Sequence, residues 1–308
     1  MLALSVWASA ALNLADYPRA RILAEDLHRA AQAAGDRRRT IDALHLQGNL
    51  AVHEGRYSAA RAPYEQALRL ARAIPDKVFE SIQLHNLGEV ERALGNYAVA
   101  KEQLEAGLQI GRDVGASKFV VHLLLELAEV ATARDDVAAA LGFATEGLTL
   151  VGEASNAEIE ARLIVLQGDA QAALGRSNEA SAAYHRARAI YRELSDARIR
   201  LEPLVGLARV AAALGHVDEA LAHVGEVEGR IDAGYDPNNA AELLWACYTV
   251  LDAVQSPRAR DVLSRAHAVL TERASLLDDA DRASFLGNVT AHRAIMTTWA
   301  ALHRTPAG

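Results

Sequence analysis

Alanine recurs at a fixed spacing of forty residues through most of this 308-residue chain. Six alanines keep the step without an insertion or a deletion between them: Ala20, Ala60, Ala100, Ala140, Ala180 and Ala220. A period this long does not fit a coiled coil, and it indicates one supersecondary unit copied in tandem, each copy burying its apolar face against the next. We therefore expect function to lie on the surface that the stack presents.

Each copy is predicted to be two helices joined by a tight turn. Apolar residues lie three and four positions apart in the first half of each copy, which is the period of a helix. A turn residue then follows at one phase: Ala15, Gly55, Gly95, Asp135, Gly175 and Gly215. Glycine, and less readily Asp, adopts the left-handed backbone that ends a helix. The second helix carries the repeated alanine, which we expect at a close helix contact, where a larger side chain would push the axes apart.

The residues around the turns of the second and third copies resemble the tetratricopeptide repeat. The matching residues are Gly48, Gly55-Arg56-Tyr57, Ala60, Tyr64 and Ala67 in one copy, and Leu87-Gly88, Gly95-Asn96-Tyr97 and Ala100 in the next. That repeat has thirty-four residues, so we expect both helices to be longer here. The resemblance implies an all-α fold, a tetratricopeptide-type α-solenoid that forms a right-handed superhelix of helix-turn-helix hairpins. The long class is similar to the arrays of kinesin light chains, of spindle-orienting adaptors and of the sensor arms of bacterial signal-transduction ATPases (STAND-type).

Six copies are predicted over residues 1–235, and residues 236–308 depart from the pattern. We expect a degenerate seventh hairpin there and one capping helix over residues 278–303, because a terminal repeat has one face in water. This region also resembles the carboxyl-terminal end of large bacterial regulators that place an ATPase or a cyclase ahead of such an array. The residues that carry this resemblance are Arg265-Ala266-His267, Leu270, Ser284-Phe285-Leu286, Asn288-Val289 and His292-Arg293. It implies an effector domain in the same parent chain, and the abrupt start of the first helix at Met1 also predicts a segment of a longer protein.

Composition and motifs argue against several classes of function. The formal net charge of -8 provides no basic stripe for nucleic acid, and we interpret Arg37-Arg38-Arg39 as a solvated turn. The single cysteine, Cys247, fits a reducing compartment, so we expect a cytoplasmic protein. No long uncharged apolar stretch predicts a membrane span. Phosphate-loop, nucleophile-elbow and His-Glu-x-x-His motifs are absent from the sequence, so we predict no enzyme activity and no cofactor.

The predicted binding surface is the concave face, which the resemblance places on the first helix of each copy. The partner-binding residues that we predict are His45, Asn49, His85, Glu89, Arg92, His122, Glu126, Glu129, Arg162, Asp169 and Arg209. Asp42, His53 and Glu202 lie at or beside the same phases. So many polar residues on one ridge exceed what burial allows, although a merely hydrated helix face is the simpler interpretation.

Three histidines of this surface, His45, His85 and His122, are expected to lie near one another. Zinc sites in helical proteins more often use two ligands on one helical turn with a carboxylate, so we predict no metal. A pH-responsive polar patch is an alternative, because histidine titrates near neutral pH.

Two functions remain open from the sequence. In the first, the chain is a protein- or peptide-binding module, the ligand-sensing or scaffolding arm of a larger bacterial signalling ATPase or regulator. Because Glu89, Glu126, Glu129 and Asp169 are expected to line the groove as a run of carboxylates, the partner should carry basic residues beside apolar anchors. In the second, the chain is a structural spacer or a self-association module with no specific small ligand.

Overall fold

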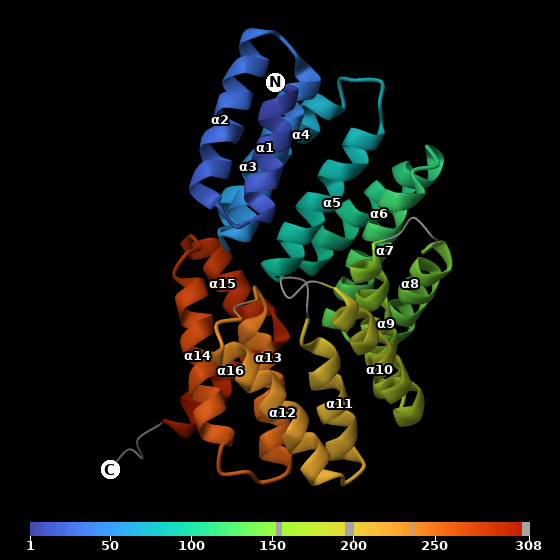
Figure 1. The fold of residues 1–308 in the computed structure, drawn as a ribbon, viewed down its shortest axis with the longest axis vertical. Coiled ribbons are helices and arrows are strands. Elements are labelled where there is room, and N and C mark those ends of the chain that lie inside the picture. The colour runs from blue at the N-terminus through green and yellow to red at the C-terminus, as the bar shows by residue number, and fades with distance from the viewer. Residues whose placement is uncertain (152–155, 195–199, 236, 304–308) are drawn as a thin grey trace. The chain divides into compact units, whose positions relative to one another are not determined.

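The computed structural model describes residues 1–151, 156–194, 200–235 and 237–303. Over these residues the chain forms helices and no strand, and Figure 1 shows consecutive helices running back and forth beside each other. The helices are α1 (Leu2–Asn13), α2 (Tyr17–Ala33), α3 (Arg37–His53), α4 (Tyr57–Ala71), α5 (Val78–Ala93), α6 (Tyr97–Asp113), α7 (Ser117–Ala133), α8 (Val137–Leu150), α9 (Ala157–Ala173), α10 (Ser177–Glu193), α11 (Glu202–Ala213), α12 (Val217–Asp232), α13 (Ala240–Ala253), α14 (Ala259–Ala274), α15 (Asp279–Asn288) and α16 (Thr290–Leu302). The prediction of an all-α hairpin repeat is confirmed, and the right-handed path of the whole array stays a prediction.

By their internal contacts, the residues group into two compact units. The first unit holds Met1–Glu126 with Leu276–Arg282, and the second holds Leu127–Ser275 with the chain from Ala283 onward. Within the units, hairpin partners such as α3 and α4, α5 and α6, or α9 and α10 make the most extensive helix contacts. The boundary predicted from the sequence between residues 235 and 236 falls at residue 236, outside the described residues.

The repeated alanines are buried, as their spacing predicts. All six are at most 3% exposed, and Ala60, Ala100, Ala180 and Ala220 are fully buried. Ala20 of α2 packs against Leu12 of α1 and Leu50 of α3. Ala180 of α10 belongs to a cluster with residues of α9 and α11. The alanine therefore lies where a second helix meets both its own first helix and the first helix of the next copy, and a methyl group lets all three approach closely.

In the second, third and fifth hairpins, a second close contact pairs a glycine with a large residue. A Cβ atom at Gly48 would lie 2.3 Å from the ring of Tyr64, and one at Gly88 would lie 2.5 Å from Leu104. Gly168 faces Tyr184 in the same way, at 2.9 Å. The glycines and their partners both follow the forty-residue step. In the fourth copy both phases carry alanine, Ala128 and Ala144, so the pairing of a glycine with a large residue does not occur there.

The turn between the helices of each hairpin has the conformation that the sequence predicts. The left-handed residues within the hairpins are Ala15, Gly55, Gly95, Asp135, Gly175, Gly215 and Gln255, with φ between 54° and 80°. Gln255 continues the forty-residue phase into the seventh hairpin, which is degenerate in sequence but keeps the register of the turn.

The C-terminal end differs from the single capping helix expected over residues 278–303. Two helices, α15 and α16, occupy this stretch, because the backbone is extended at Val289 (φ -67°, ψ 117°). The buried His292 stabilises the break: its Nδ1 donates to the Phe285 carbonyl oxygen at 2.9 Å, and its Nε2 lies 3.0 Å from a carboxylate oxygen of Glu242 on α13. A continuous helix could not make both contacts with one ring. No helix of the described chain is both long enough and apolar enough to span a lipid bilayer.

The contact between Gly48 and Tyr64 predicts that Gly48→Ala destabilises the protein. The added methyl group would overlap a rigid ring that is 1% exposed, so we expect a loss of about 1–3 kcal/mol in the free energy of unfolding. Gly142→Ala is the matched control, because no atom lies within 4 Å of its added Cβ, and replacing a helical glycine should stabilise by about 0.5–1 kcal/mol. Urea denaturation measures both, and equal effects would contradict the packing described here.

Candidate functional site

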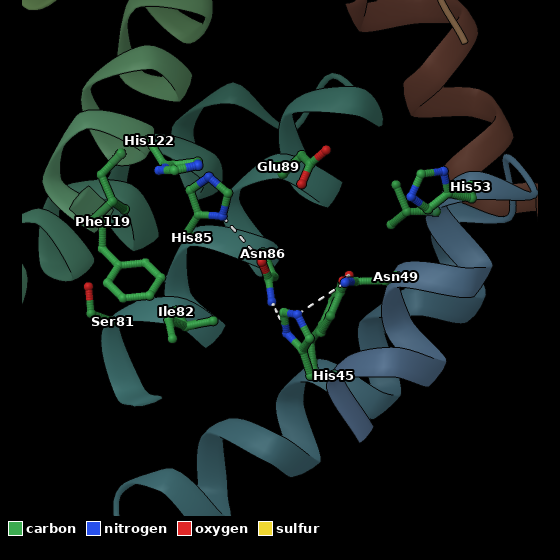
Figure 2. Close-up of a pocket in the computed structure, with 13 residues that line it drawn as sticks. His45, Asn49, His53, Ser81, Ile82, His85, Asn86, Glu89, Phe119 and His122 are labelled. Atoms are coloured by element: carbon green, nitrogen blue, oxygen red, sulfur yellow. Dashed lines mark hydrogen bonds between the residues drawn. The ribbon is translucent and has the colours of Figure 1, made fainter. Parts of the chain in front are cut away.

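A cavity of about 350 Å³ opens in the first unit between successive hairpins (Figure 2). Its walls come from three first helices, α3, α5 and α7, together with one side chain of α4. The lining residues are His45, Asn49, Val52, His53, Tyr64, Ser81, Ile82, His85, Asn86, Glu89, Phe119, His122 and Leu123. Polar and aromatic side chains thus face one another around a floor that includes aliphatic residues.

The forty-residue step explains why these polar side chains meet. His45 and Asn49 are one helical turn apart on α3, and His85 and Glu89 occupy the same two phases on α5. Residues four apart share a face of a helix, so each helix contributes a matched pair to the same surface. His122 of α7 completes the wall, with its ring 6.0 Å from that of His85 and perpendicular to it.

Hydrogen bonds join five of the lining side chains in one chain that runs from α4 to α5 (Figure 2). The Tyr64 hydroxyl donates to Oδ1 of Asn49 at 2.6 Å. The amide nitrogens of Asn49 and Asn86 lie 3.0 and 2.8 Å from Nε2 and Nδ1 of His45, respectively. Oδ1 of Asn86 lies 3.2 Å from Nδ1 of His85. We call this chain of side chains the imidazole relay.

The two amides cannot both donate to His45. A neutral imidazole has one N–H and one lone pair, so one of the two amides must turn its oxygen toward the ring. If Asn86 turns, its nitrogen donates to Nδ1 of His85, and the proton of His85 is on Nε2. If Asn49 turned instead, its NH2 group would face the Tyr64 hydroxyl, which would lose the oxygen to which it donates, so the bond from Tyr64 favours the turn of Asn86. The imidazole relay therefore links the tautomer of the buried His45 ring to the tautomer of His85.

The electrostatics of the cavity keep its rings neutral on the α3 side. Burial, together with a smaller effect of the neighbouring His85, lowers the pKa of His45 to about 4. Burial also lowers the pKa of His53. The Tyr64 hydroxyl stays protonated, because burial, followed by the charge of Glu89, raises its pKa well above the ordinary value. The described lining residues include one carboxylate, that of Glu89, and neither Lys nor Arg.

His122 has a defined tautomer in its neutral form. Its Nδ1 lies 2.8 Å from the carbonyl oxygen of Lys118. A carbonyl oxygen only accepts hydrogen bonds, so Nδ1 carries the proton and Nε2 carries the lone pair. The Phe119 ring lies 6.5 Å from the His122 ring and belongs to the same wall.

Of the predicted binding residues, the structure brings five together: His45, Asn49, His85, Glu89 and His122. The sequence did not single out Asn86, which is adjacent to the predicted phase, or Phe119 and Ile82, which read as apolar positions. Tyr64 was recognised only as part of the repeat motif, although its hydroxyl anchors the relay. The signal in the sequence was the hydroxyl group of Tyr64, a core residue of the repeat that lies next to the predicted row of polar residues.

Two acidic residues of the expected run of carboxylates form ion pairs with arginines of this chain. Glu126 is 3% exposed, and its carboxylate accepts from Nε of Arg92 at 2.7 Å, so this pair contributes to packing. Glu129 is paired with Arg162 in a bridge between adjacent copies of the repeat.

Asp169 is also engaged within the second unit. It accepts from the hydroxyl of Tyr184 at 2.8 Å and pairs with Arg209 at 2.5 Å. Glu129, Arg162, Asp169 and Arg209 belong to the second unit and stay predictions as binding residues. Among the described residues, no three His, Cys, Asp or Glu side chains converge as ligands for a metal ion.

Comparison with known proteins agrees with this architecture. Residues 41–74, which include most of α3 and all of α4, match the family model described as tetratricopeptide repeat. No curated protein matches the chain in sequence. The chain is a tetratricopeptide-type array of helical hairpins, with copies longer than the family repeat.

Several solved structures share the fold. NprR in complex with its cognate peptide NprX is 13% identical, with a TM-score of 0.65 over 99% of this chain and 87% of that one. A Rap protein complexed with competence and sporulation factor is 16% identical, with a TM-score of 0.58 over 92% of this chain and 84% of that one. A signal transduction ATPase with numerous domains and a tetratricopeptide repeat sensor, from Pyrococcus horikoshii, is 15% identical, with a TM-score of 0.63 over 98% of this chain and 47% of that one. At these identities the likeness concerns the fold.

The lowered pKa of His45 predicts that acid destabilises the protein through this ring. Because the pKa in the folded state, about 4, lies below the ordinary value of 6.5, the unfolded chain binds the proton more tightly. The stability that neutral His45 contributes is present above about pH 6.5 and is lost as the pH falls toward 4. Urea denaturation at pH 7 and 4.5 should show the wild type losing about 2 kcal/mol more than His45→Gln. Parallel losses would mean that His45 is not held in its neutral form.

Proposed function

We propose that this chain is a peptide-binding repeat module that takes part of its ligand into the cavity of the first unit. The observation that carries the proposal is that three successive first helices direct polar side chains into one cavity. A merely hydrated face would need neither a cavity nor an ordered set of hydrogen bonds among its side chains. A ligand pocket is expected to combine apolar walls with a few placed polar groups, and this cavity has both.

The size of the cavity favours a peptide over a compact cofactor. Its volume, about 350 Å³, is near the lower end of ligand pockets, which span about 300–1,000 Å³. That space suits one or two side chains of an extended segment, while the rest of the segment lies along the neighbouring first helices. Amide side chains such as Asn49 and Asn86 offer both a donor and an acceptor, which is the pairing that a peptide group requires.

The broader role that we propose is the sensing arm of a larger bacterial signalling ATPase or regulator in the cytoplasm. Binding in the array would be relayed to an effector domain elsewhere in the parent chain. The likeness in fold to the sensor-bearing ATPase and to the NprR and Rap complexes supports this role. In this role the chain acts by binding a protein or a peptide and has neither catalytic activity nor nucleic-acid or membrane ligands.

A displayed library of random twelve-residue peptides, panned on the immobilised full chain, tests the proposal. Peptides selected on the wild type should lose binding to His122→Trp, because the larger ring fills the cavity. Lys118→Trp is the matched control, since Lys118 lies one helical turn away on α7 and its side chain is exposed; it should bind as the wild type does. Selected peptides that bind both variants equally would place the site elsewhere and contradict the proposal.

Self-association is a second candidate, which an exposed apolar face of α1 favours. Val6 and Trp7 are 57% and 58% exposed, whereas Leu46, forty residues after Val6, is 7% exposed where α3 packs on α2. A second copy of the chain that covers this face would bury it in the same way.

Sedimentation velocity distinguishes this candidate from peptide binding alone. If α1 mediates self-association, the wild type should form a dimer and Val6→Lys should be a monomer, because a charge at a buried apolar contact is costly. Ile22→Lys, at an exposed position of α2 (60% exposed), should not change the state. A wild type that is monomeric at micromolar concentration would exclude this second role.

A further inference from the structure

We infer that Tyr64 determines which hydrogen-bonding group the cavity offers to its ligand. Through the imidazole relay, the Tyr64 hydroxyl places the proton of His85 on Nε2, so that this ring presents an N–H donor to a guest. The ligand group that complements this donor is an uncharged carbonyl oxygen, as a peptide bond carries. The inference rests on the proposed function and specifies one contact of the ligand, so peptide binding in the cavity can hold even if this contact fails.

The direction of the relay is set at its buried end. Tyr64 is 1% exposed, and its hydroxyl donates to Oδ1 of Asn49 at 2.6 Å. If the amide of Asn49 turned, the hydroxyl proton would face an NH2 group, and a buried donor without an acceptor is costly. Asn49 therefore keeps its oxygen at Tyr64 and its NH2 group at His45.

Each following member of the relay has its proton assigned by the one before it. Nε2 of His45 accepts from the Asn49 amide at 3.0 Å, so the neutral ring carries its proton on Nδ1. Nδ1 then donates to the Asn86 oxygen, over a contact of 2.8 Å. The NH2 group at the other end of the Asn86 amide lies against Nδ1 of His85, over a contact of 3.2 Å, and donates to it.

His85 is the end of the relay that faces the ligand. Because its Nδ1 accepts, the neutral ring carries its proton on Nε2. His85 is half-buried and lines the cavity, and Figure 2 shows its ring between Asn86 and His122. Among the described residues, the hydrogen bond of His85 is the one with Asn86 through Nδ1, so Nε2 is available to the ligand. The hydroxyl of Tyr64 thus determines the position of a proton at the far end of the relay.

Charge in the cavity favours a neutral acceptor over a carboxylate. The described lining residues include neither Lys nor Arg, and burial holds His45 in its neutral form by lowering its pKa to about 4. A carboxylate guest would therefore leave water without a cation among the lining side chains, which is costly. A carbonyl oxygen accepts hydrogen bonds without a formal charge, so one N–H donor satisfies it at a smaller cost of desolvation. A donor group of the ligand would face another donor at Nε2 of His85.

Apolar side chains flank the donor. Ile82 precedes His85 by one turn of α5 and lies on the same face of the helix, and Phe119 comes from α7. Both are half-buried and line the cavity. In an extended peptide a carbonyl group follows each side chain, so an apolar side chain can pack on these residues while its own carbonyl oxygen meets Nε2 of His85. The subsite is therefore expected to fit a peptide bond that follows an apolar residue.

The tautomer of His85 tests the relay without any ligand. The imidazole ¹⁵N spectrum of the histidine-labelled full chain at pH 8 should show His85 with a protonated Nε2 and an unprotonated Nδ1. In Tyr64→Phe the hydroxyl is lost, the two directions of the relay become similar in energy, and the His85 nitrogens should move to intermediate shifts. Tyr184→Phe is the matched control, because it removes the hydroxyl at the same phase of the fifth copy, where it donates to Asp169 at 2.8 Å. An unchanged His85 in Tyr64→Phe, or a wild-type His85 protonated on Nδ1, would overturn the inference.

A substitution that reverses the relay keeps the test valid if the first variant folds poorly. Asn49→Asp preserves the shape of the side chain and an oxygen for the tyrosine hydroxyl, but a carboxylate cannot donate. His45 must then donate from Nε2 and accept at Nδ1, Asn86 presents its oxygen to His85, and the proton of His85 moves to Nδ1. Gln32→Glu, the same chemical change at an exposed position of α2, is the matched control. A His85 that keeps its proton on Nε2 in Asn49→Asp would contradict the relay.

Two small probes of similar shape test the chemistry of the ligand on the full chain. N,N-dimethylisovaleramide has one carbonyl acceptor, no N–H group and a branched apolar tail, and its thioamide replaces the oxygen with sulfur, a weaker acceptor. We expect the carbonyl probe to shift Nε2 of His85 saturably and to bind about fivefold more tightly than the thioamide. This preference should be lost in His85→Phe and in Asn49→Asp, and retained in Gln32→Glu. Equal affinities of the two probes for the wild type would overturn the assignment of a carbonyl group.

The library experiment distinguishes this inference from the proposed function. Selected peptides that lose affinity for the wild type, but not for His85→Phe, when the carbonyl after one apolar residue becomes a thioamide would support both. Selected peptides that bind in the cavity and tolerate a thioamide at every position would retain the proposed function and reject the donor at His85. A chain that selects no peptide and binds neither probe would reject both.

Discussion

The close approach of three helices at one buried methyl group is the contact on which the rest of the structure depends. Each repeated alanine lies where a second helix meets its own first helix and the next one, and any larger side chain would separate them. Glycine against tyrosine or leucine supplies a second contact of the same kind inside the hairpin. Because both contacts recur every forty residues, successive first helices present equivalent positions to one side. The positions on this surface are therefore periodic whatever residues occupy them.

Because of this periodicity, polar residues at the same phase of successive copies come together in one site. His45 and Asn49 on α3 meet His85 and Glu89 on α5 because the pairs occupy identical phases, and α7 adds His122 to the same wall. The scaffold also determines the protonation of the wall. Burial behind α4 and α5 keeps His45 neutral, and the Tyr64 hydroxyl anchors one end of the chain of hydrogen bonds. The ion pairs of Glu126 with Arg92 and of Asp169 with Arg209 connect neighbouring first helices.

The sequence predicted the parts of the fold that follow from the repeat. The turns, the buried alanines and the hairpin order all follow from the forty-residue step, because a repeated sequence folds into a repeated structure. The break at Val289 was missed because it depends on His292 reaching both Phe285 and Glu242, a long-range contact without a local signal. The site was predicted in part: residues at repeated phases were identified, but Asn86 lies one position outside the phase. Glu126 was expected to line the groove, and its burial was not foreseen because its partner Arg92 comes from the preceding copy of the repeat.

The central claim is that the repeat frame holds His45 in its neutral form and orders the wall of the cavity through hydrogen bonds. The most direct measurement is the imidazole ¹⁵N spectrum of the full chain, selectively labelled at histidine and recorded near pH 7. The account predicts that His45 has one protonated and one unprotonated ring nitrogen, and that His122 carries its proton on Nδ1. A doubly protonated His45 at this pH, or a His122 protonated on Nε2 alone, would contradict it.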